Sequence, residues 1–330
     1  MKTARLAFLA GLCLAAGLAA LPGGAWAAPH KFAMIVPGPI EDSDFNFRGY
    51  EVVEDVKKHY KMPASLSERI SPADAERVAR EYIASGHTIV AFHGGQYFSL
   101  VRKLSPAFPK TVLVIESSAP GTFGKNVWNV HRKFNEGFYA FGALAGLSTK
   151  TNNIGVIAGI QLPDFRASIN SISDALKQVN PKAKLVYSFT GDQNDPIKAR
   201  QTAEAMMANK VDFIINMVNL GVYGVIEAAK ASKNKVLVTT FYTDKTEKAP
   251  DHLAGTLILD FRPPYRKVVD GILKGQTSGY VAMQPGNGFE LAGIRNVPPQ
   301  AAAKTKELFE KVQRGEIKVR NELTKIDMAK

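Results

Sequence analysis

The segment 42–51 gathers the side chains best suited to hold a small molecule. It combines acids, an amide and aromatic rings within ten residues, just after a short apolar run. An aromatic face stacks on a flat ring for about 0.5–1.5 kcal/mol beyond the area it buries, while Asn and Asp read ring edges through hydrogen bonds. The segment therefore indicates a site for a polar aromatic ligand, with candidate residues Asp42, Asp44, Phe45, Asn46 and Tyr50. The alternative is an ordinary helix start, capped by Asp42 or Ser43, with Phe45 in the core.

A second group of polar residues lies in the glycine-containing segment 93–97, which follows the apolar run 88–92. Glycines at the start of a helix let backbone N–H groups approach an anion. His93 and Gln96 are binding candidates here, and the alternative is that they satisfy backbone groups of their own loop. The chain has no Gly-x-Gly-x-x-Gly after its first apolar run and no phosphate loop, which disfavours nucleotide cofactors.

Catalytic and metal-binding patterns are poor. The six histidines are widely spaced, with no His-x-x-x-His pair, and Cys13 is the only cysteine. The sequence also lacks a Gly-x-Ser-x-Gly turn, in which a serine would be an exposed nucleophile. We expect no cofactor, no metal site and no enzymatic activity.

The N-terminus predicts export. Lys2 and Arg5 precede an apolar run over 6–21, and Ala25-Trp26-Ala27 supplies a small-x-small cleavage pattern, so we place a signal peptide at 1–27. Leu12 before Cys13 does not fit a lipoprotein signal and argues against a lipid anchor. No later segment approaches the roughly 18 uninterrupted apolar residues of a membrane span. The expected location is the periplasm, with contact to the membrane only through a transporter.

The charge is basic, with 42 Lys and Arg against 30 Asp and Glu and a formal net charge of +12. The cations are interspersed with acids, and no arginine-rich block with interleaved aromatics is present. We interpret this as a solvated surface and expect no nucleic-acid partner.

Apolar runs alternate with amphipathic stretches along the chain. Predicted strands occupy 31–36, 88–92, 111–115, 153–159, 184–189, 213–218, 235–241 and 255–259, and predicted helices occupy 47–60, 72–84, 136–148, 165–179, 197–209 and 223–231. This alternation predicts an α/β fold of two doubly wound parallel-sheet lobes, with a hinge and an interlobe cleft where the strand-to-helix loops face each other. The expected boundaries are 28–150 and 260–290 for the N-terminal lobe, 151–259 for the C-terminal lobe, and 291–330 for a packing segment and polar tail.

The segment 42–51 also resembles the Asp-x-Ser-Phe-Asn-x-x-x-Trp-Glu-Gly signature of the basic membrane protein family of transporter substrate-binding proteins, which includes purine nucleoside receptors. Further stretches are similar to that family in order and spacing: 126–130, 136–137, 144–146, 153–159, 188–192 and 224–229. The resemblance runs from about Lys31 to Pro298. It implies a type I periplasmic binding protein that closes its lobes over a solute and passes it to the permease of an ABC transporter.

Departures from the family pattern bear on the ligand. The family carries an acid that grips ribose hydroxyls, and this chain has Tyr242 in the corresponding stretch. A purine nucleobase or related heterocycle is therefore the predicted ligand. The resemblance carries Phe45 and Asn46 directly to the pocket. Weaker candidates are Trp128, Phe189, Asn219, Tyr242, Asp260 and Arg262, where Trp128 and Phe189 have ordinary core packing as the alternative.

Two other functions stay open at this point. The first is a receptor for a nucleoside or another aromatic heterocycle. The second is an exported hydrolase or sensor protein with the same two lobes, in which Asp42 or Asp44 acts as a general base.

Overall fold

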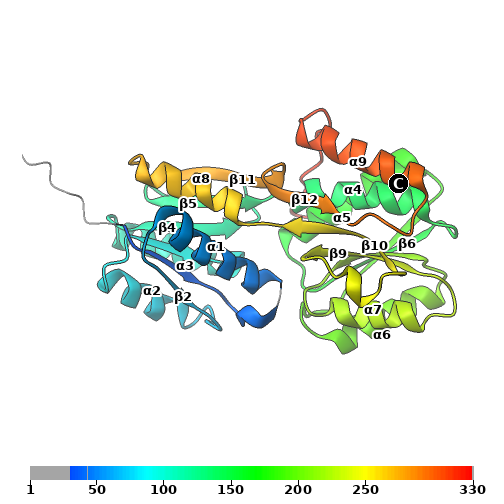
Figure 1. Ribbon diagram of the computed structural model, residues 1–330, viewed down its shortest axis with the longest axis horizontal. Helices are drawn as coiled ribbons and strands as arrows, with labels where there is room; N and C mark the ends of the chain where they lie inside the picture. The colour runs from blue at the N-terminus through cyan, green and yellow to red at the C-terminus, as the bar shows by residue number, and fades with distance from the viewer. Residues whose placement is uncertain (1–29, 43, 329–330) are drawn as a thin grey trace, which may run out of the picture.

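A computed structural model describes residues 30–42 and 44–328 of the chain. The predicted signal peptide and Cys13 lie outside these residues. Figure 1 shows two lobes placed end to end along the long axis of the molecule, with the helices packed on the faces of the strands. No described helix is long and apolar enough to cross a membrane.

The N-terminal lobe contains a parallel sheet in the order β2-β1-β3-β4-β5-β11. Its strands are β1 (Phe32–Ile35), β2 (Ala64–Ser67), β3 (Ile89–Phe92), β4 (Val112–Ser117), β5 (Val127–Arg132) and β11 (Gly279–Pro285). The helices of this lobe are α1 (Phe45–Tyr60), α2 (Ala75–Ala84), α3 (Phe98–Ala107) and α8 (Arg262–Leu273), with the short η1 (Ile40–Asp42) and η2 (Gly95–Tyr97) before α1 and α3.

The C-terminal lobe repeats this plan with the strand order β12-β10-β9-β8-β6-β7, in which only β12 runs antiparallel to its neighbour β10. Its strands are β6 (Asn153–Ala158), β7 (Lys184–Phe189), β8 (Phe213–Met217), β9 (Leu237–Tyr242), β10 (Leu253–Leu259) and β12 (Gly288–Ala292). Its helices are α4 (Phe134–Ser148), α5 (Pro163–Val179), α6 (Pro196–Ala208), α7 (Val222–Ala231) and α9 (Pro299–Gln313), with η3 (Thr246–Lys248) after β9.

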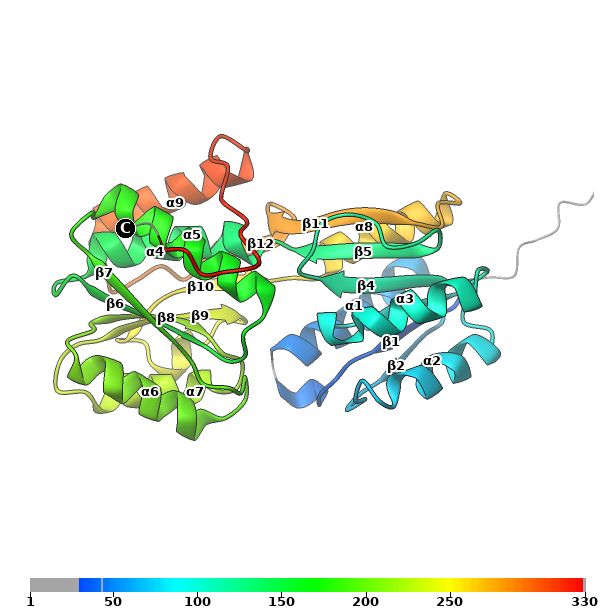
Figure 2. The ribbon, with the colours of Figure 1, turned by 180° about the vertical axis from the view of Figure 1, so that it is seen from behind.

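Helices cover both faces of each sheet, which explains why the central strands read as uninterrupted apolar runs. In the N-terminal lobe, α1 and α8 share one core cluster with the sheet, while α2 and α3 share another on the opposite face. Figure 2 shows α2 and α3 in front of that sheet. In the C-terminal lobe, α6 and α7 form their own core cluster, and α4 and α5 cover the other face. The expected α/β fold is confirmed.

The chain crosses between the lobes at three places: after β5, after β10, and between β11 and β12. Hydrogen bonding runs through all twelve strands, but β11 and β12 are joined by only two residue pairs, Gln284 with Gly288 and Pro285 with Phe289. The two halves are therefore separate lobes, and their sheets are joined only by this short pairing of β11 with β12.

The first crossing lies one helix earlier than the sequence boundary at residue 150. Helix α4 directly follows β5 but packs against α5 and α9 of the C-terminal lobe, and twelve of its residues are buried there. A Cβ atom on Gly142 would lie 2.5 Å from the carbonyl oxygen of Ile172, so the absence of a side chain at this position permits the close approach of α4 to α5. Strand β12 and helix α9 also belong to the C-terminal lobe, whereas the sequence assigned 291–330 to a separate packing segment.

Candidate functional site

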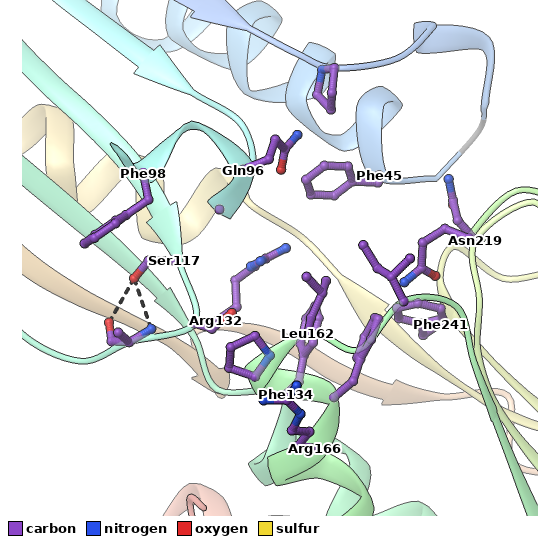
Figure 3. A pocket seen from close by; sticks show the side chains of 18 of the residues that line it. Phe45, Gln96, Phe98, Ser117, Arg132, Phe134, Leu162, Arg166, Asn219 and Phe241 are labelled. Atoms are coloured by element: carbon purple, nitrogen blue, oxygen red, sulfur yellow. Dashed lines mark hydrogen bonds between the residues drawn. The ribbon is translucent and has the colours of Figure 1, made fainter. Parts of the chain in front are cut away.

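A cleft of about 1000 Å³ lies between the lobes, at the carboxyl ends of the strands. In each sheet the strand order reverses beside the first strand of its lobe, and loops diverge there to leave room for a ligand. Figure 3 shows side chains from both lobes converging on this space. Its lining residues are Pro37, Gly38, Phe45, Asn46, Gly95, Gln96, Phe98, Ser117, Ser118, Ala119, Arg132, Phe134, Ile160, Leu162, Pro163, Phe165, Arg166, Gln193, Asn194, Asn219, Phe241, Tyr242, Leu323 and Thr324.

Phe45 reaches the cleft from the first turn of α1 and is supported from behind. Its ring stacks on the imidazole of His93, with centroids 4.0 Å apart and planes inclined by 19°. His93 also lies 2.6 Å from the Phe45 carbonyl oxygen through Nε2, and its Nδ1 contacts Oε1 of Glu116. Tyr265 donates a hydrogen bond to that same Oε1 at 3.0 Å. This chain of buried contacts fixes the position of the Phe45 ring.

Asp42 forms the turn that presents Phe45. Its Oδ1 accepts hydrogen bonds from the backbone N–H groups of Asp44 and Phe47, at 2.9 and 3.0 Å. Its Oδ2 accepts from the backbone and side-chain nitrogens of Asn46, at 2.9 and 2.7 Å. Asp42 thus satisfies free donors at the start of α1, as the capping alternative proposed. Phe45 is half-buried: it packs against the core cluster and also lines the cleft.

Asp44 lies outside the lining of the cleft and joins the lobes through a buried ion pair. Its Oδ1 is 2.5 Å from Nζ of Lys245, and Thr243 donates to the same oxygen at 2.8 Å. Burial raises the pKa of Asp44 to about 6, which the neighbouring Lys245 ammonium only partly offsets. Burial also lowers the pKa of Lys245, against the attraction of Asp44. For both ions the loss of hydration therefore outweighs their mutual attraction.

Tyr242 lies in the lining, at the end of β9. Its φ angle is +71°, in the left-handed region that a residue with a side chain seldom adopts, and its carbonyl oxygen accepts a hydrogen bond from Nη2 of Arg48 at 2.8 Å. The Tyr242 ring lies 4.2 Å from that of Phe241 and 5.8 Å from that of Phe45. This contact brings aromatic rings of both lobes together.

Arg132 is a lining residue that the sequence analysis did not identify. It ends β5 at the first crossing, is only 5% exposed, and places its guanidinium 5.7 Å from the Phe45 ring centroid and 5.2 Å from that of Phe134. Its Nη2 is 3.3 Å from Oδ2 of Asp164 on α5. Phe134, Leu162 and Phe165 were missed as well. All four belong to a strand-to-helix connection. Arg132 and Phe134 flank the junction of β5 and α4, while Leu162 precedes α5 and Phe165 lies in its first turn.

The predicted binding set divides into three groups. Five members line the cleft: Phe45, Asn46, Gln96, Asn219 and Tyr242. Asp42, Asp44 and His93 lie directly behind them, in the contacts described above. The remaining candidates are elsewhere, namely Tyr50, Trp128, Phe189, Asp260 and Arg262.

Packing explains the position of these remaining candidates. Trp128 is buried against α8, where a Cβ atom on Gly271 would lie 2.5 Å from its ring, and its Nε1 donates to the Gln276 carbonyl at 3.3 Å. Tyr50 packs beside Phe47, with ring centroids 6.1 Å apart. Phe189, half-buried, ends β7 beside Tyr187.

Asp260 and Arg262 form an ion pair with each other, with Nε to Oδ1 at 2.8 Å. They line a separate cavity of about 410 Å³ at the second crossing.

The C-terminal segment 316–328 contributes to the cleft, although the sequence assigned it a packing or solvated role. Leu323 and Thr324 are lining residues. The segment is held against α5, where Arg320 pairs with Asp174 through Nε at 3.0 Å and Nη2 at 2.9 Å, and Asn170 binds backbone groups of residues 325 and 327. Within the described ranges, no cluster of three His, Asp or Glu residues could hold a metal ion.

Comparison with known proteins adds a family to this geometry. Residues 30–313 match the family described as ABC transporter substrate-binding protein, PnrA-like. A purine-binding protein of Brucella abortus is 23% identical over 304 residues, covering 89% of this chain and 85% of its own length. A CD4+ T-cell-stimulating antigen of Listeria monocytogenes is 26% identical over 206 residues, which cover 60% of this chain and only 57% of the antigen.

Solved structures share the two-lobed fold. An ABC transporter solute-binding protein from Conexibacter woesei superimposes with a TM-score of 0.72 at 24% identity, covering 89% of this chain and 99% of that one. A solute-binding protein from Aeropyrum pernix gives a TM-score of 0.77 at 16% identity, covering 89% and 94%. At these identities the likeness concerns the fold.

Proposed function

This chain belongs to the family of PnrA-like ABC transporter substrate-binding proteins, and on that premise we propose that it captures a purine nucleobase or a related heterocycle outside the cytoplasmic membrane. The bound solute passes to the permease of an ABC uptake transporter. The protein performs this task by binding and lobe closure, without covalent chemistry, and reaches the periplasm through the predicted signal peptide.

The observation that carries the proposal is a cleft with aromatic rings from both lobes. Phe45 comes from the N-terminal lobe, and Phe241 and Tyr242 come from the C-terminal lobe. A planar ligand gains free energy from stacking on such faces, and its edges meet amide groups such as those of Gln96 and Asn219. The purine-binding relative from Brucella abortus supports the same class of ligand.

A bare base fits this lining better than a nucleoside. Among the described residues that line the cleft, none is Asp or Glu, so no carboxylate is present to accept hydrogen bonds from both hydroxyls of a ribose. The ring of Tyr242, in the stretch where the family carries its ribose-binding acid, also takes up space that a sugar would need. We therefore expect guanine or hypoxanthine to bind more tightly than the matching nucleosides.

Closure requires contacts made by both lobes, because a ligand shifts an equilibrium only through its different affinity for the two states. The Asp44–Lys245 pair and the bond from Arg48 to the Tyr242 carbonyl already join the lobes on one side of the cleft. Three crossings form the hinge about which the lobes move.

Closure of this kind makes ligand affinity depend on pH. The closed protein holds a proton on Asp44 with a pKa of about 6, whereas an open, hydrated Asp44 has a pKa near 4. Protonation of Asp44 therefore stabilises the closed state relative to the open one. This stabilisation is complete below about pH 4 and is lost as the pH rises through about 6. We expect hypoxanthine affinity, measured by calorimetry, to rise up to about tenfold from pH 7 to pH 5. The variant Asp44→Asn removes the titrating group and should show a flat profile.

The C-terminal segment gives a smaller expected effect. Substituting Arg320→Gln removes the bidentate pair with Asp174 and loosens the segment that carries Leu323 and Thr324. We expect ligand affinity to fall by about two- to fivefold, in line with the loss of roughly 1 kcal/mol from a half-exposed pair. Calorimetry with Arg314→Gln, whose ion-pair partners Glu310 and Glu316 are not among the lining residues, provides the control.

The test of the proposed function is direct. Native mass spectrometry of freshly purified protein should reveal a retained heterocycle, and calorimetry with nucleobases and nucleosides should show one binding site per chain without turnover. Release of a free base from nucleosides would contradict the proposal and support a hydrolase. The carboxylate of Asp42 argues against that outcome, because backbone and amide donors already occupy both of its oxygens.

A further inference from the structure

The charged side chains described in the cleft lining are all positive. Among its described residues, the only charged side chains are Arg132 and Arg166. Arg166 is half-exposed and donates to the Thr324 carbonyl at 3.3 Å, whereas Arg132 is almost completely buried. A ligand that enters this cleft therefore meets a buried positive charge with no carboxylate among the residues that face it.

Arg132 has hydrogen-bonding capacity that the described protein does not use. Its Nε is buried and has no acceptor among the described residues. Within ranges 30–42 and 44–328, its one ion-pair contact is the 3.3 Å approach of Nη2 to Asp164, whose Oδ2 also lacks a hydrogen bond there. A buried N–H without a partner costs free energy, which a ligand acceptor recovers on binding.

The side chain is also held in one orientation. The rings of Phe45 and Phe134 lie within cation–π distance of the guanidinium, and neither ring competes for its N–H groups. Figure 3 shows Arg132 between these rings, at the centre of the lining. A guanidinium fixed in this way presents a planar set of donors that matches two adjacent acceptor atoms better than one.

We propose that Arg132 selects a planar heterocycle with an acidic oxo edge, in which an exocyclic oxygen and a deprotonated ring nitrogen lie side by side. For purines this means the anionic oxopurines, such as urate, rather than aminopurines such as adenine. The anion supplies the negative charge that the described lining residues lack. Its edge accepts hydrogen bonds from the unused N–H groups of Arg132, while its face stacks on the Phe45 ring. This inference rests on the proposed function, since it specifies the ligand of the same cleft.

The competing explanation is structural. Arg132 belongs to the last strand before the first crossing, and Asp164 belongs to α5 of the other lobe, so the pair could serve only to align the lobes. A structural role lowers the affinity for every ligand alike when Arg132 is replaced. A selective role lowers the affinity for the anion alone, so the ratio of two dissociation constants distinguishes the two explanations.

The experiment measures calorimetric dissociation constants for urate and adenine at pH 7.5. The wild-type protein should bind urate at least tenfold more tightly than adenine. In the variant Arg132→Gln, urate binding should weaken at least tenfold while adenine binding changes by less than threefold. Arg77→Gln, an exposed arginine on α2, is the matched control and should retain the wild-type ratio. Thermal unfolding of each variant establishes that it is folded.

Two results overturn the inference. One is tighter binding of adenine than of urate by the wild-type protein, and the other is a parallel loss of both ligands in Arg132→Gln. In either case the proposed function stands, because a purine still binds. If the wild-type protein binds neither urate, adenine, guanine nor hypoxanthine, the proposed function itself fails.

Discussion

Replacing Phe45 with alanine is expected to weaken ligand binding at least tenfold. The ring stacks on His93 on one side and lines the cleft, so its removal takes away the face on which a planar ligand rests. Aromatic stacking contributes about 0.5–1.5 kcal/mol beyond buried area, and the buried area adds to it, while a factor of ten corresponds to about 1.4 kcal/mol. The measurement is isothermal titration calorimetry with the heterocycle found in the purified protein.

A control for this substitution lies two residues away. Phe47 is on the same helix turn as Phe45, packs beside Tyr50, and is absent from the residues that line the cleft. Phe47→Ala removes an equal number of atoms and should change the dissociation constant by less than threefold. Unchanged affinity in Phe45→Ala would remove the proposed stacking surface.

Replacing Lys245 with methionine is expected to weaken ligand binding by about ten- to a hundredfold. The substitution leaves the carboxylate of Asp44, only 1% exposed in this structure, without its ammonium partner. Breaking a buried ion pair costs about 3–5 kcal/mol, but two effects reduce the cost here: Asp44 can take up a proton, and opening of the lobes returns it to water. The remaining cost of about 1.5–3 kcal/mol falls on the closed, ligand-bound state.

A double substitution tests this explanation. Because burial outweighs attraction for both ions, removing both charges in Asp44→Asn with Lys245→Met should restore much of the affinity. Lys248→Met changes an exposed lysine in η3 and should have little effect. Small-angle X-ray scattering with saturating ligand should show a more extended particle for Lys245→Met alone. Equal losses in the single and double variants would show that the pair does not control closure.

The central architecture could be predicted from the sequence because parallel strands covered on both faces must be apolar throughout. The run 88–92 became β3 for that reason, and all four residues of the strand are buried. Strand β2 was missed because Ala64–Ser67 lies at the edge of the sheet and is only half-buried, so nothing in its residues requires an apolar pattern. Backbone pairing with β1 forms this strand.

The position of α4 illustrates a different limit. Its abundance of small and apolar residues predicted close packing, yet the sequence could not show which lobe supplies the partner. Since α4 packs on α5 rather than on the strand before it, the first crossing moved to Arg132. That shift places Arg132 and Phe134 in the cleft, and it explains why sequence analysis of strand-to-helix loops in the N-terminal lobe did not include them.

The same reasoning explains the split in the predicted binding residues. Side chains four positions apart on a strand point to the same face, so Trp128 and Arg132 share one face of β5. Trp128 packs against α8, whereas Arg132 is the last residue of the strand and reaches the lining, and one sequence does not reveal where the strand ends. The segment 42–51 was easier, because Asp42 determines the local turn through its own hydrogen bonds.

The placement of Leu323 makes the protein suitable as an optical reporter of its own ligand. This residue belongs to a segment tied to α5 by Arg320, so a dye attached through Leu323→Cys would stay beside the bound solute. The only natural thiol of the chain is Cys13, within the predicted leader, so labelling of the processed protein would occur at one site. Fluorescence changes during titration would then follow occupancy in real time.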